Sequence, residues 1–153
     1  MGLNMTNMVR NKVAIVGKLD SKKYAPYNDF TWDIWTLNYF QDVPRVDLLF
    51  DIHTHNANPQ ANITRANYPF KEAEALVGGN YYNNTFSYMI AYGILKGYKE
   101  IALYGARFIV DEEIRTQQRQ SVREIVMFAR GRGIKVTAPF DKCLLAEYPY
   151  YDR

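Results

Sequence analysis

The chain is poor in the residues that form disulfides and hold transition metals: it has one cysteine, Cys143, and two histidines, His53 and His55. A single cysteine excludes an internal disulfide, and no cysteine cluster is available for a metal site. The sequence has no run of about 18 apolar residues, so no membrane-spanning helix is predicted. The net charge of +3 is too small to argue for nucleic-acid binding by itself. We therefore expect a cytoplasmic protein whose partner is neither a membrane nor a nucleic acid.

What the chain does contain is the composition of one folded domain. Its 153 residues match the size of an ordinary domain, and 48% of them are hydrophobic against 23% charged. The aromatic share of 15%, with 13 tyrosines, requires hydrogen-bond partners, an interface or flat ligands to stack on. We predict a single domain over residues 1–153, with a flexible segment at residues 1–10.

Five short apolar runs predict the strands of a sheet: residues 12–17, 33–36, 46–52, 101–104 and 134–137. The runs are nearly continuous rather than alternating, which is typical of strands covered on both faces and hence of a parallel sheet. Three helices are predicted over residues 69–77, 85–96 and 112–130, from apolar spacing and from Pro, Asn, Thr and Gly boundary signals. The predicted fold class is α/β: a mostly parallel five-stranded sheet with helices on both faces, connected by right-handed crossovers.

Ligands of an open parallel sheet bind at the carboxyl ends of its strands, so the residues that follow each strand are candidates. These are Gly17, Lys18 and Ser21 after the first predicted strand, Asn38 after the second, His53 after the third, and Gly105 and Arg107 after the fourth. Asn84 and Thr85 begin the second predicted helix, whose N-terminus favours an anion such as a phosphate. The amides and hydroxyls among these residues suit ribose or a sugar. The alternative is that polar residues follow strands because chain turns are solvated.

Asp51, His53 and His55 would share one face if the third strand continued through them, since alternate residues of a strand point the same way. That spacing suits a divalent metal, but the sequence flags no further carboxylate to complete the site, and we predict no metal. His53 is instead the candidate general base or hydrogen-bonding residue. The alternative is a histidine that merely begins a loop.

Arg115, Arg119 and Arg123 recur at every fourth position of the last predicted helix. Like charges at this spacing repel slightly, and a solvated face with local partners is the favoured interpretation. A phosphate contact or a partner-subunit contact is the alternative. The aromatic residues 148–151 favour a docked C-terminus or a subunit contact, and we expect a homo-oligomer.

Two blocks, residues 88–91 (Tyr-Met-Ile-Ala) and 97–105 (Gly-Tyr-Lys-Glu-Ile-Ala-Leu-Tyr-Gly), resemble the nucleotide-binding half of the bacterial sialyltransferases of glycosyltransferase family 42. Over nearly its full length the chain resembles small phage-encoded Rossmann-like proteins of unassigned function. That pattern consists of the Trp-x-Leu-Asn segment at 35–38, the strand ending in His53, the segment at 97–101, Gln118-Arg119 and the Ala-Arg-Gly-Arg-Gly-Ile run at 129–134.

The resemblance implies a Rossmann-like fold in which Gly17, Asn38, Asn84, Thr85 and Gly105 line a nucleotide pocket. The chain departs from the sialyltransferase pattern at Lys18, where that family has Asn, and at Arg107, where it has Asp. Both cations would favour an extra phosphate. The segment that carries the catalytic histidine of those transferases has no counterpart here, so nucleotide binding is implied more strongly than sugar transfer.

The sequence thus favours a protein that binds a nucleotide or nucleotide-sugar and, if it is an enzyme, transfers a nucleotide-activated group with His53 as base. The only small molecule expected is this ligand. Two alternatives remain open. One is a non-catalytic binder that sequesters a host nucleotide signal. The other is a structural protein whose aromatic and arginine surfaces form an assembly.

Overall fold

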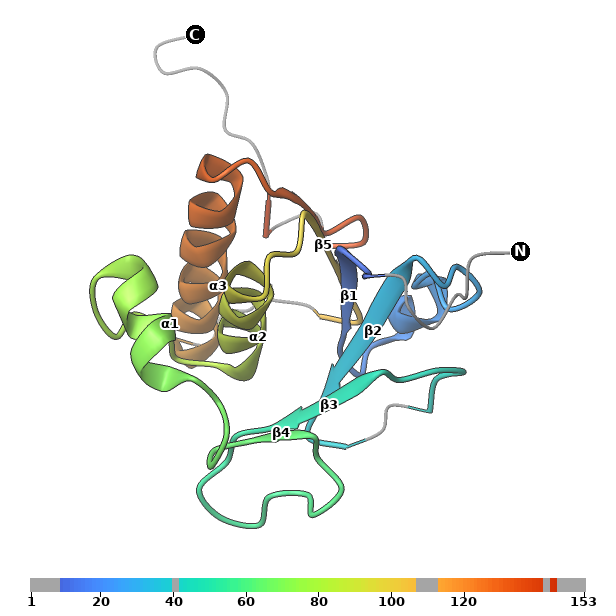
Figure 1. Cartoon of the computed structure of the whole chain (residues 1–153), viewed down its shortest axis with the longest axis horizontal. Helices are drawn as coiled ribbons and strands as arrows, with labels where there is room; N and C mark the ends of the chain where they lie inside the picture. Colours follow the sequence, from blue (N-terminus) through green and yellow to red (C-terminus); the bar gives the residue numbers. More distant parts are fainter. Residues whose placement is uncertain (1–8, 40–41, 107–112, 142–143, 146–153) are drawn as a thin grey trace, which may run out of the picture.

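Six parallel strands form one sheet at the centre of the fold (Figure 1). The computed structural model describes residues 9–39, 42–106, 113–141 and 144–145. The strands are β1 (Lys12–Val16), β2 (Trp32–Leu37), β3 (Leu48–Asp51), β4 (Ile63–Thr64), β5 (Glu100–Tyr104) and β6 (Lys135–Thr137). Their order across the sheet is β4-β3-β2-β1-β5-β6. All five predicted strands are present, and β4 is an additional two-residue strand at one edge.

β1 lies inside the sheet because its side chains are apolar on both faces. Val13, Ala14, Ile15 and Val16 are all fully buried. Val13 and Ile15 belong to a large core on one face, whereas Ala14 and Val16 belong to a smaller core on the other. Strands buried on both faces are typical of parallel sheets. This pattern explains why a continuous apolar run predicted the strand correctly.

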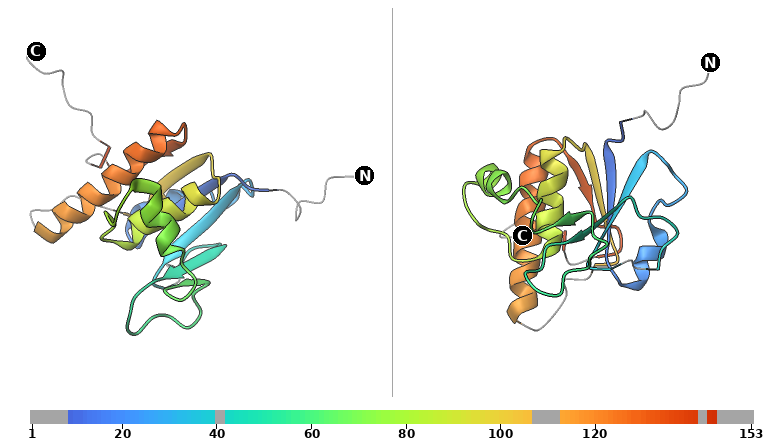
Figure 2. Two further views of the ribbon diagram at one scale, coloured as in Figure 1. Left: turned by 60° about the vertical axis from the view of Figure 1, so that its left-hand side comes forward. Right: turned by 60° about the horizontal axis from the view of Figure 1, so that its bottom comes forward.

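Helices cover both faces of the sheet, but unequally (Figure 2). The helices α1 (Phe70–Val77), α2 (Thr85–Leu95) and α3 (Glu113–Gly131) contribute to the larger core, on the face that presents Val13 and Ile15. On the other face, the described residues form one short 3-10 helix, η2 (Asp20–Tyr24). Right-handed crossovers explain this division, because the chain moves from β1 to β2 in one direction and from β4 to β5 and β6 in the other. The predicted fold class, a Rossmann-like α/β domain with a parallel sheet, is confirmed.

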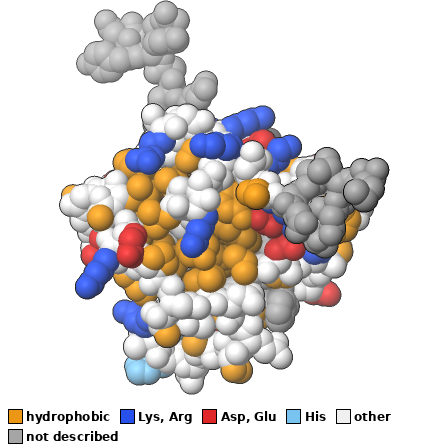
Figure 3. Space-filling view, viewed as in Figure 1, with side chains coloured by type: hydrophobic (Ala, Val, Ile, Leu, Met, Phe, Trp, Pro, Cys, Tyr) orange, Lys and Arg blue, Asp and Glu red, His pale blue; other side chains and the backbone are white. Residues whose placement is uncertain are grey.

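Aromatic packing in the larger core accounts for part of the high aromatic content. The ring of Trp35 packs against Phe50, Tyr92 and Tyr98, with centroids 5.1–5.5 Å apart. Within the described parts of the chain, four tyrosine hydroxyls donate hydrogen bonds to carbonyl or carboxylate oxygens: those of Tyr27, Tyr68, Tyr82 and Tyr98. Hydrophobic side chains also reach the surface across the middle of the face in Figure 3, with Lys and Arg scattered around them.

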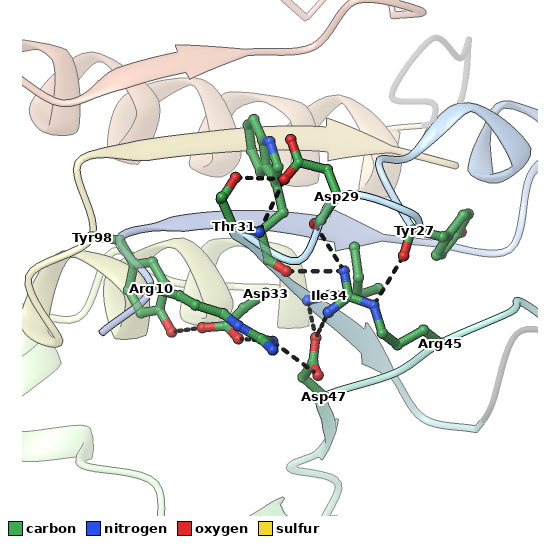
Figure 4. Close-up of polar contacts among 10 residues, drawn as sticks. Arg10, Tyr27, Asp29, Thr31, Asp33, Ile34, Arg45, Asp47 and Tyr98 are labelled. Carbon is green, nitrogen blue, oxygen red and sulfur yellow. Dashed lines mark hydrogen bonds and ion pairs between the residues drawn. The ribbon is translucent and has the colours of Figure 1, made fainter. Parts of the chain in front are cut away.

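A network of charged side chains closes the amino-terminal edge of the sheet (Figure 4). Arg45 donates to the carbonyl oxygens of Tyr27, Asp29 and Trp32 and pairs with Asp47 at 2.9 Å. Asp47 also accepts the Ile34 N–H. Two further residues extend the network: Arg10 pairs with Asp33 and Asp47, and Tyr98 donates to Asp33. The charged groups at this edge are therefore paired with one another or with backbone groups of the same domain.

The carboxyl-terminal edge is arranged differently, because the chain leaves it in two directions. β1 and β5 are neighbours in the sheet, and the chain leaves β1 toward β2 but leaves β5 toward β6. Such a topological switch point leaves a crevice outside the strand ends, which is where ligands bind in this class of sheet. Among the described residues, no helix is long and apolar enough to span a membrane.

Candidate functional site

A cavity of about 600 Å³ opens at the carboxyl-terminal edge, between the ends of β1, β2, β3 and β5 and the N-terminus of α2. Seven of the predicted site residues line it: Gly17, Lys18, Asn38, His53, Asn84, Thr85 and Gly105. They come from five separate parts of the chain. The prediction that these residues meet along one rim is therefore confirmed, while their role in binding stays a prediction.

The floor of the cavity is made by the backbones of Gly17 and Gly105. The Gly17 N–H donates to the Tyr104 carbonyl at 2.8 Å, and the Leu19 N–H donates to the Gly105 carbonyl at 3.0 Å. A Cβ atom on Gly17 would lie 2.5 Å from the Gly105 carbonyl oxygen, which is too close for any side chain. Gly105 also has a φ of 66°, in the left-handed region that favours glycine. Both glycines are therefore required by the meeting of β1 and β5.

One described residue among the predicted site residues does not line the cavity. Ser21 is not among the lining residues, and its hydroxyl accepts the Gly105 N–H at 2.8 Å. Ser21 thus holds the Gly105 backbone rather than lining the cavity, and its predicted role in ligand binding stays a prediction. Arg107 lies outside the described residues, as do Cys143 and the aromatic residues 148–151.

The N-terminus of α2 forms one wall, and Asn84 caps it. The Asn84 side-chain oxygen accepts the Ser87 N–H at 3.0 Å, and its Nδ2 donates to the Gln118 carbonyl of α3 at 3.2 Å. Both the oxygen and the nitrogen of the Asn84 side-chain amide therefore form hydrogen bonds within the protein. Thr85 follows in the first turn and is half-buried on the cavity wall. The positive end of the helix dipole lies here and favours an anion.

The cavity walls carry two cations among the residues that the structure describes, Lys18 and Arg65. Lys18 follows β1 and Arg65 follows β4, and both side chains line the cavity. Arg65 packs over the Phe70 ring at 5.3 Å and donates to the Ile52 carbonyl at 3.4 Å. None of the described lining residues is Asp or Glu. Sequence reasoning missed Arg65, because nothing in its local pattern indicated that the loop would bring it to the strand ends.

Asp51 and His53 form a bonded pair at the cavity rim. Asp51 is buried at the end of β3, and its Oδ1 lies 2.7 Å from His53 Nδ1. The Asp51 carboxylate also accepts the backbone N–H groups of His53 and Asn58 at 3.1 and 2.9 Å. Burial by itself would raise the pKa of Asp51, but the bonds from Asn58 and His53 outweigh it and hold this pKa below its ordinary value.

Asp51, His53 and His55 do not line up on one face of a strand, so the metal site that their spacing suited does not form. β3 ends at Asp51, so the strand does not continue through the two histidines, and His55 is exposed and outside the cavity lining. No group of three or more His, Cys, Asp or Glu side chains is close enough to hold a metal among the residues that the structure describes.

Asn38, in the cavity wall, has a buried side-chain oxygen for which the described residues offer no hydrogen-bond partner. Its φ is 68°, its N–H donates to the Phe50 carbonyl at 2.7 Å, and its carbonyl accepts from Asn58 Nδ2 at 3.2 Å. Its side-chain Oδ1 is buried and has no hydrogen-bond partner among the described residues. Tyr39 follows it with an exposed ring at the mouth of the cavity. An unpaired buried acceptor is costly, so Asn38 is suited to receive a hydrogen bond from a ligand.

The arginine series on α3 is only partly described. Arg123 donates to the Leu144 carbonyl at 2.9 Å, which agrees with the favoured interpretation of local partners. The side chain of Arg115 lies outside the described residues. Gln118, which precedes Arg119 on the same helix, lines the cavity.

Comparisons with protein-family models, with curated proteins and with solved structures found no match. The resemblance to family 42 sialyltransferases and to phage-encoded proteins therefore stays a prediction.

Proposed function

We propose that the cavity binds a nucleotide or nucleotide-sugar, with its phosphate held by Lys18, Arg65 and the N-terminus of α2. The observation that supports this most strongly is the charge of the walls, which combine two cations with a helix N-terminus and, among the described lining residues, no carboxylate. Arg and Lys in such an arrangement favour phosphate groups. The cavity volume of about 600 Å³ also falls within the usual range for small-molecule sites.

The other walls suit the nucleoside part of such a ligand. The exposed ring of Tyr39 offers a surface on which a base can stack. The unpaired Oδ1 of Asn38 would accept a hydrogen bond from an amino or hydroxyl group.

Thermal unfolding in the presence of ligands tests the proposal. The protein is heated with nucleoside mono- and diphosphates, with nucleotide-sugars and with the corresponding nucleosides, all at matched ionic strength. A ligand at 100 times its Kd stabilises by about 2.7 kcal/mol, which for a chain of this size is a Tm increase of roughly 5–10 °C. We expect an increase with at least one phosphate-bearing compound and a smaller or no increase with its nucleoside.

Two variants and two controls locate the binding site. Arg65→Ala and Lys18→Ala should each reduce the increase in Tm. Arg132→Ala is matched to the first, since Arg132 is also exposed and packs over a ring, that of Phe128 at 5.6 Å, away from the cavity. Lys135→Ala is matched to the second, since Lys135 is an exposed lysine at the start of β6. If no phosphate compound raises the Tm, or if the control variants lose the effect equally, the proposal is wrong.

A further inference from the structure

The imidazole of His53 has one nitrogen held by the fold and one that is accessible. Its Nδ1 lies 2.7 Å from Oδ1 of Asp51. Burial by itself would raise the pKa of Asp51, but the bonds from Asn58 and His53 outweigh it, so this pKa lies below its ordinary value and the carboxylate is ionised at neutral pH. An ionised carboxylate only accepts hydrogen bonds, which places the proton of a neutral His53 ring on Nδ1. Nε2 of that ring then carries a lone pair.

The surrounding backbone fixes the orientation of the pair. The side chain of Asp51 is 4% exposed, and its Oδ2 accepts the Asn58 N–H at 2.9 Å. Asn58 Nδ2 donates to the Asn38 carbonyl at 3.2 Å, so the loop after β3 is tied to the end of β2. The side chain of His53 is 56% exposed and lines the cavity. Nε2 is therefore the ring nitrogen that a ligand in the cavity can contact.

The protonation state of His53 decides what Nε2 presents to an anion. On the neutral ring, the lone pair of Nε2 repels an anionic oxygen. On the protonated ring, Nε2 carries an N–H group and the imidazole carries a positive charge, and both attract a phosphate oxygen. Nδ1 can stay bonded to Asp51 in both forms, so protonation does not turn the ring away from the cavity. His53 shares this cavity with Lys18 and Arg65, the two cations assigned above to phosphate.

We propose that His53 in its protonated form is a third phosphate-binding residue of the cavity, and this inference rests on the proposed nucleotide site. Nε2 donates to a phosphate oxygen of the ligand while Nδ1 stays bonded to Asp51. The affinity for a phosphate-bearing ligand therefore increases as His53 gains its proton, in the range of about pH 8 to 5 where histidines change charge. A nucleoside without phosphate gains no affinity from this protonation.

Among the described residues, no other group near His53 accounts for such a pH dependence. The charged and titratable groups of the cavity lining and of the pair are Lys18, Tyr39, Asp51, Arg65 and Tyr88. Histidine is the side chain that normally changes charge between about pH 5 and 8. Asp51 stays ionised in this range because its pKa is lowered, and Tyr88 stays neutral because burial raises its pKa. His55 is exposed and outside the cavity lining, so it provides the control.

The position of the imidazole proton can be measured without any ligand. The chain has only two histidines, so two sets of imidazole nitrogen signals are expected in a long-range ¹⁵N NMR spectrum. At a pH where both rings are neutral, the His53 proton should lie on Nδ1. A proton on Nε2 would overturn the inference, because a neutral His53 could then already donate to a phosphate.

Calorimetric titration at several pH values tests the phosphate contact itself. The probes are ribonucleoside mono- and diphosphates and nucleotide-sugars, with the nucleosides as controls. The phosphate of a probe can also titrate in this range, so the informative quantity is the ratio of the Kd of His53→Gln to that of wild type at each pH. We expect this ratio to rise about tenfold between about pH 8 and pH 5.5, the gain from one charge-assisted hydrogen bond. The same ratio for His55→Gln should stay near one.

The outcomes separate this inference from the proposed function. If a phosphate compound binds but the His53→Gln ratio stays constant within about twofold, the proposed function holds and the inference is wrong. An equal rise in the ratio for His55→Gln, or for the nucleosides, also overturns the inference, because the effect would then not come from a contact between His53 and phosphate. If no phosphate compound binds at any pH, the proposed function fails and the inference fails with it.

Discussion

Gly17 and Gly105 pack backbone against backbone where β1 and β5 end, and neither has room for a Cβ atom beside the other. Gly17→Ala and Gly105→Ala should therefore lower the free energy of unfolding by more than about 1 kcal/mol, with Gly105→Ala adding the strain of a φ of 66°. Urea denaturation measures the change.

Gly131→Ala is the control for both glycine variants. Gly131 ends α3, and a Cβ atom there would meet nothing within 4 Å. Its stability should stay the same or rise slightly, because alanine favours a helix. A fully stable Gly17→Ala would show that the two strand ends are not packed as described.

Asn38 is expected to lower stability in the empty protein and to increase ligand affinity. Asn38→Gly keeps a backbone that tolerates φ of 68° and removes the unpaired buried oxygen. Its unfolding free energy should rise or stay within about 0.5 kcal/mol of wild type, while Asn38→Ala should lose about 1 kcal/mol or more to left-handed strain. Nucleotide affinity should fall in both variants.

Asn56→Gly is the matched control, since Asn56 is also left-handed, with φ of 55°, but is exposed and outside the cavity. It should leave nucleotide affinity unchanged. Equal destabilisation by Asn38→Gly and Asn38→Ala in urea denaturation would contradict the assignment, because it would mean that the side-chain amide has a partner in the folded protein.

Arg45 stabilises the amino-terminal edge through the shape of its guanidinium group. Arg45→Ala removes the donor to three carbonyl oxygens and to Asp47, and should lower the unfolding free energy by about 2 kcal/mol or more. Arg45→Lys keeps the charge but not the planar fork, so it should restore less than half of the loss. Full recovery with lysine would show that only the charge matters.

Stability should fall steeply in strong alkali. Burial raises the pKa of Tyr27 and of Tyr82 to about 12, against roughly 10 in an unfolded chain. The folded state therefore holds these protons more tightly, and the stabilisation is complete below about pH 10 and is lost as the pH rises toward 12. Chemical denaturation across this range, with wild type and with Tyr27→Phe/Tyr82→Phe, measures the loss.

The double variant should lose less stability than wild type over the same pH range, because phenylalanine has no proton to release. The double variant should still lose some stability as the pH rises, since burial also raises the pKa of Tyr68, Tyr88, Tyr98 and Tyr104. Tyr81→Phe replaces an exposed ring and serves as the control. Identical curves for wild type and the double variant would contradict the prediction.

The sheet and helices could be predicted from the sequence because each has a strong local signal. β1 is a continuous apolar run, and α2 begins at an asparagine cap and precedes Gly97. β4 has no such signal, because only Ile63 and Thr64 pair with β3. Side chains hold it in place instead: Asn62 accepts the Leu49 N–H, and Asn67 accepts the Thr64 N–H. Asparagines in a predicted loop do not reveal which backbone groups they bind.

The site was predictable where it depends on topology and unpredictable where it depends on a loop. Gly17, Asn38 and Gly105 follow strands, so a parallel sheet alone brings them to one edge. Arg65 reaches the cavity because the loop after β3 returns to the sheet, which no local pattern indicated. Ser21 also follows β1, but η2 turns its hydroxyl toward the Gly105 backbone.

Amide chemical-shift mapping tests the central claim, that the cavity at the ends of β1 and β5 binds a nucleotide through its phosphate, most directly. ¹⁵N-labelled protein is titrated with nucleoside mono- and diphosphates at constant ionic strength. We predict saturable shifts at Gly17, Thr85 and Gly105, with little change at Asp33 and Asp47 on the opposite edge. Unmoved cavity amides, or shifts confined to another surface such as the apolar hollow beside Tyr81 and Phe128, would contradict the account.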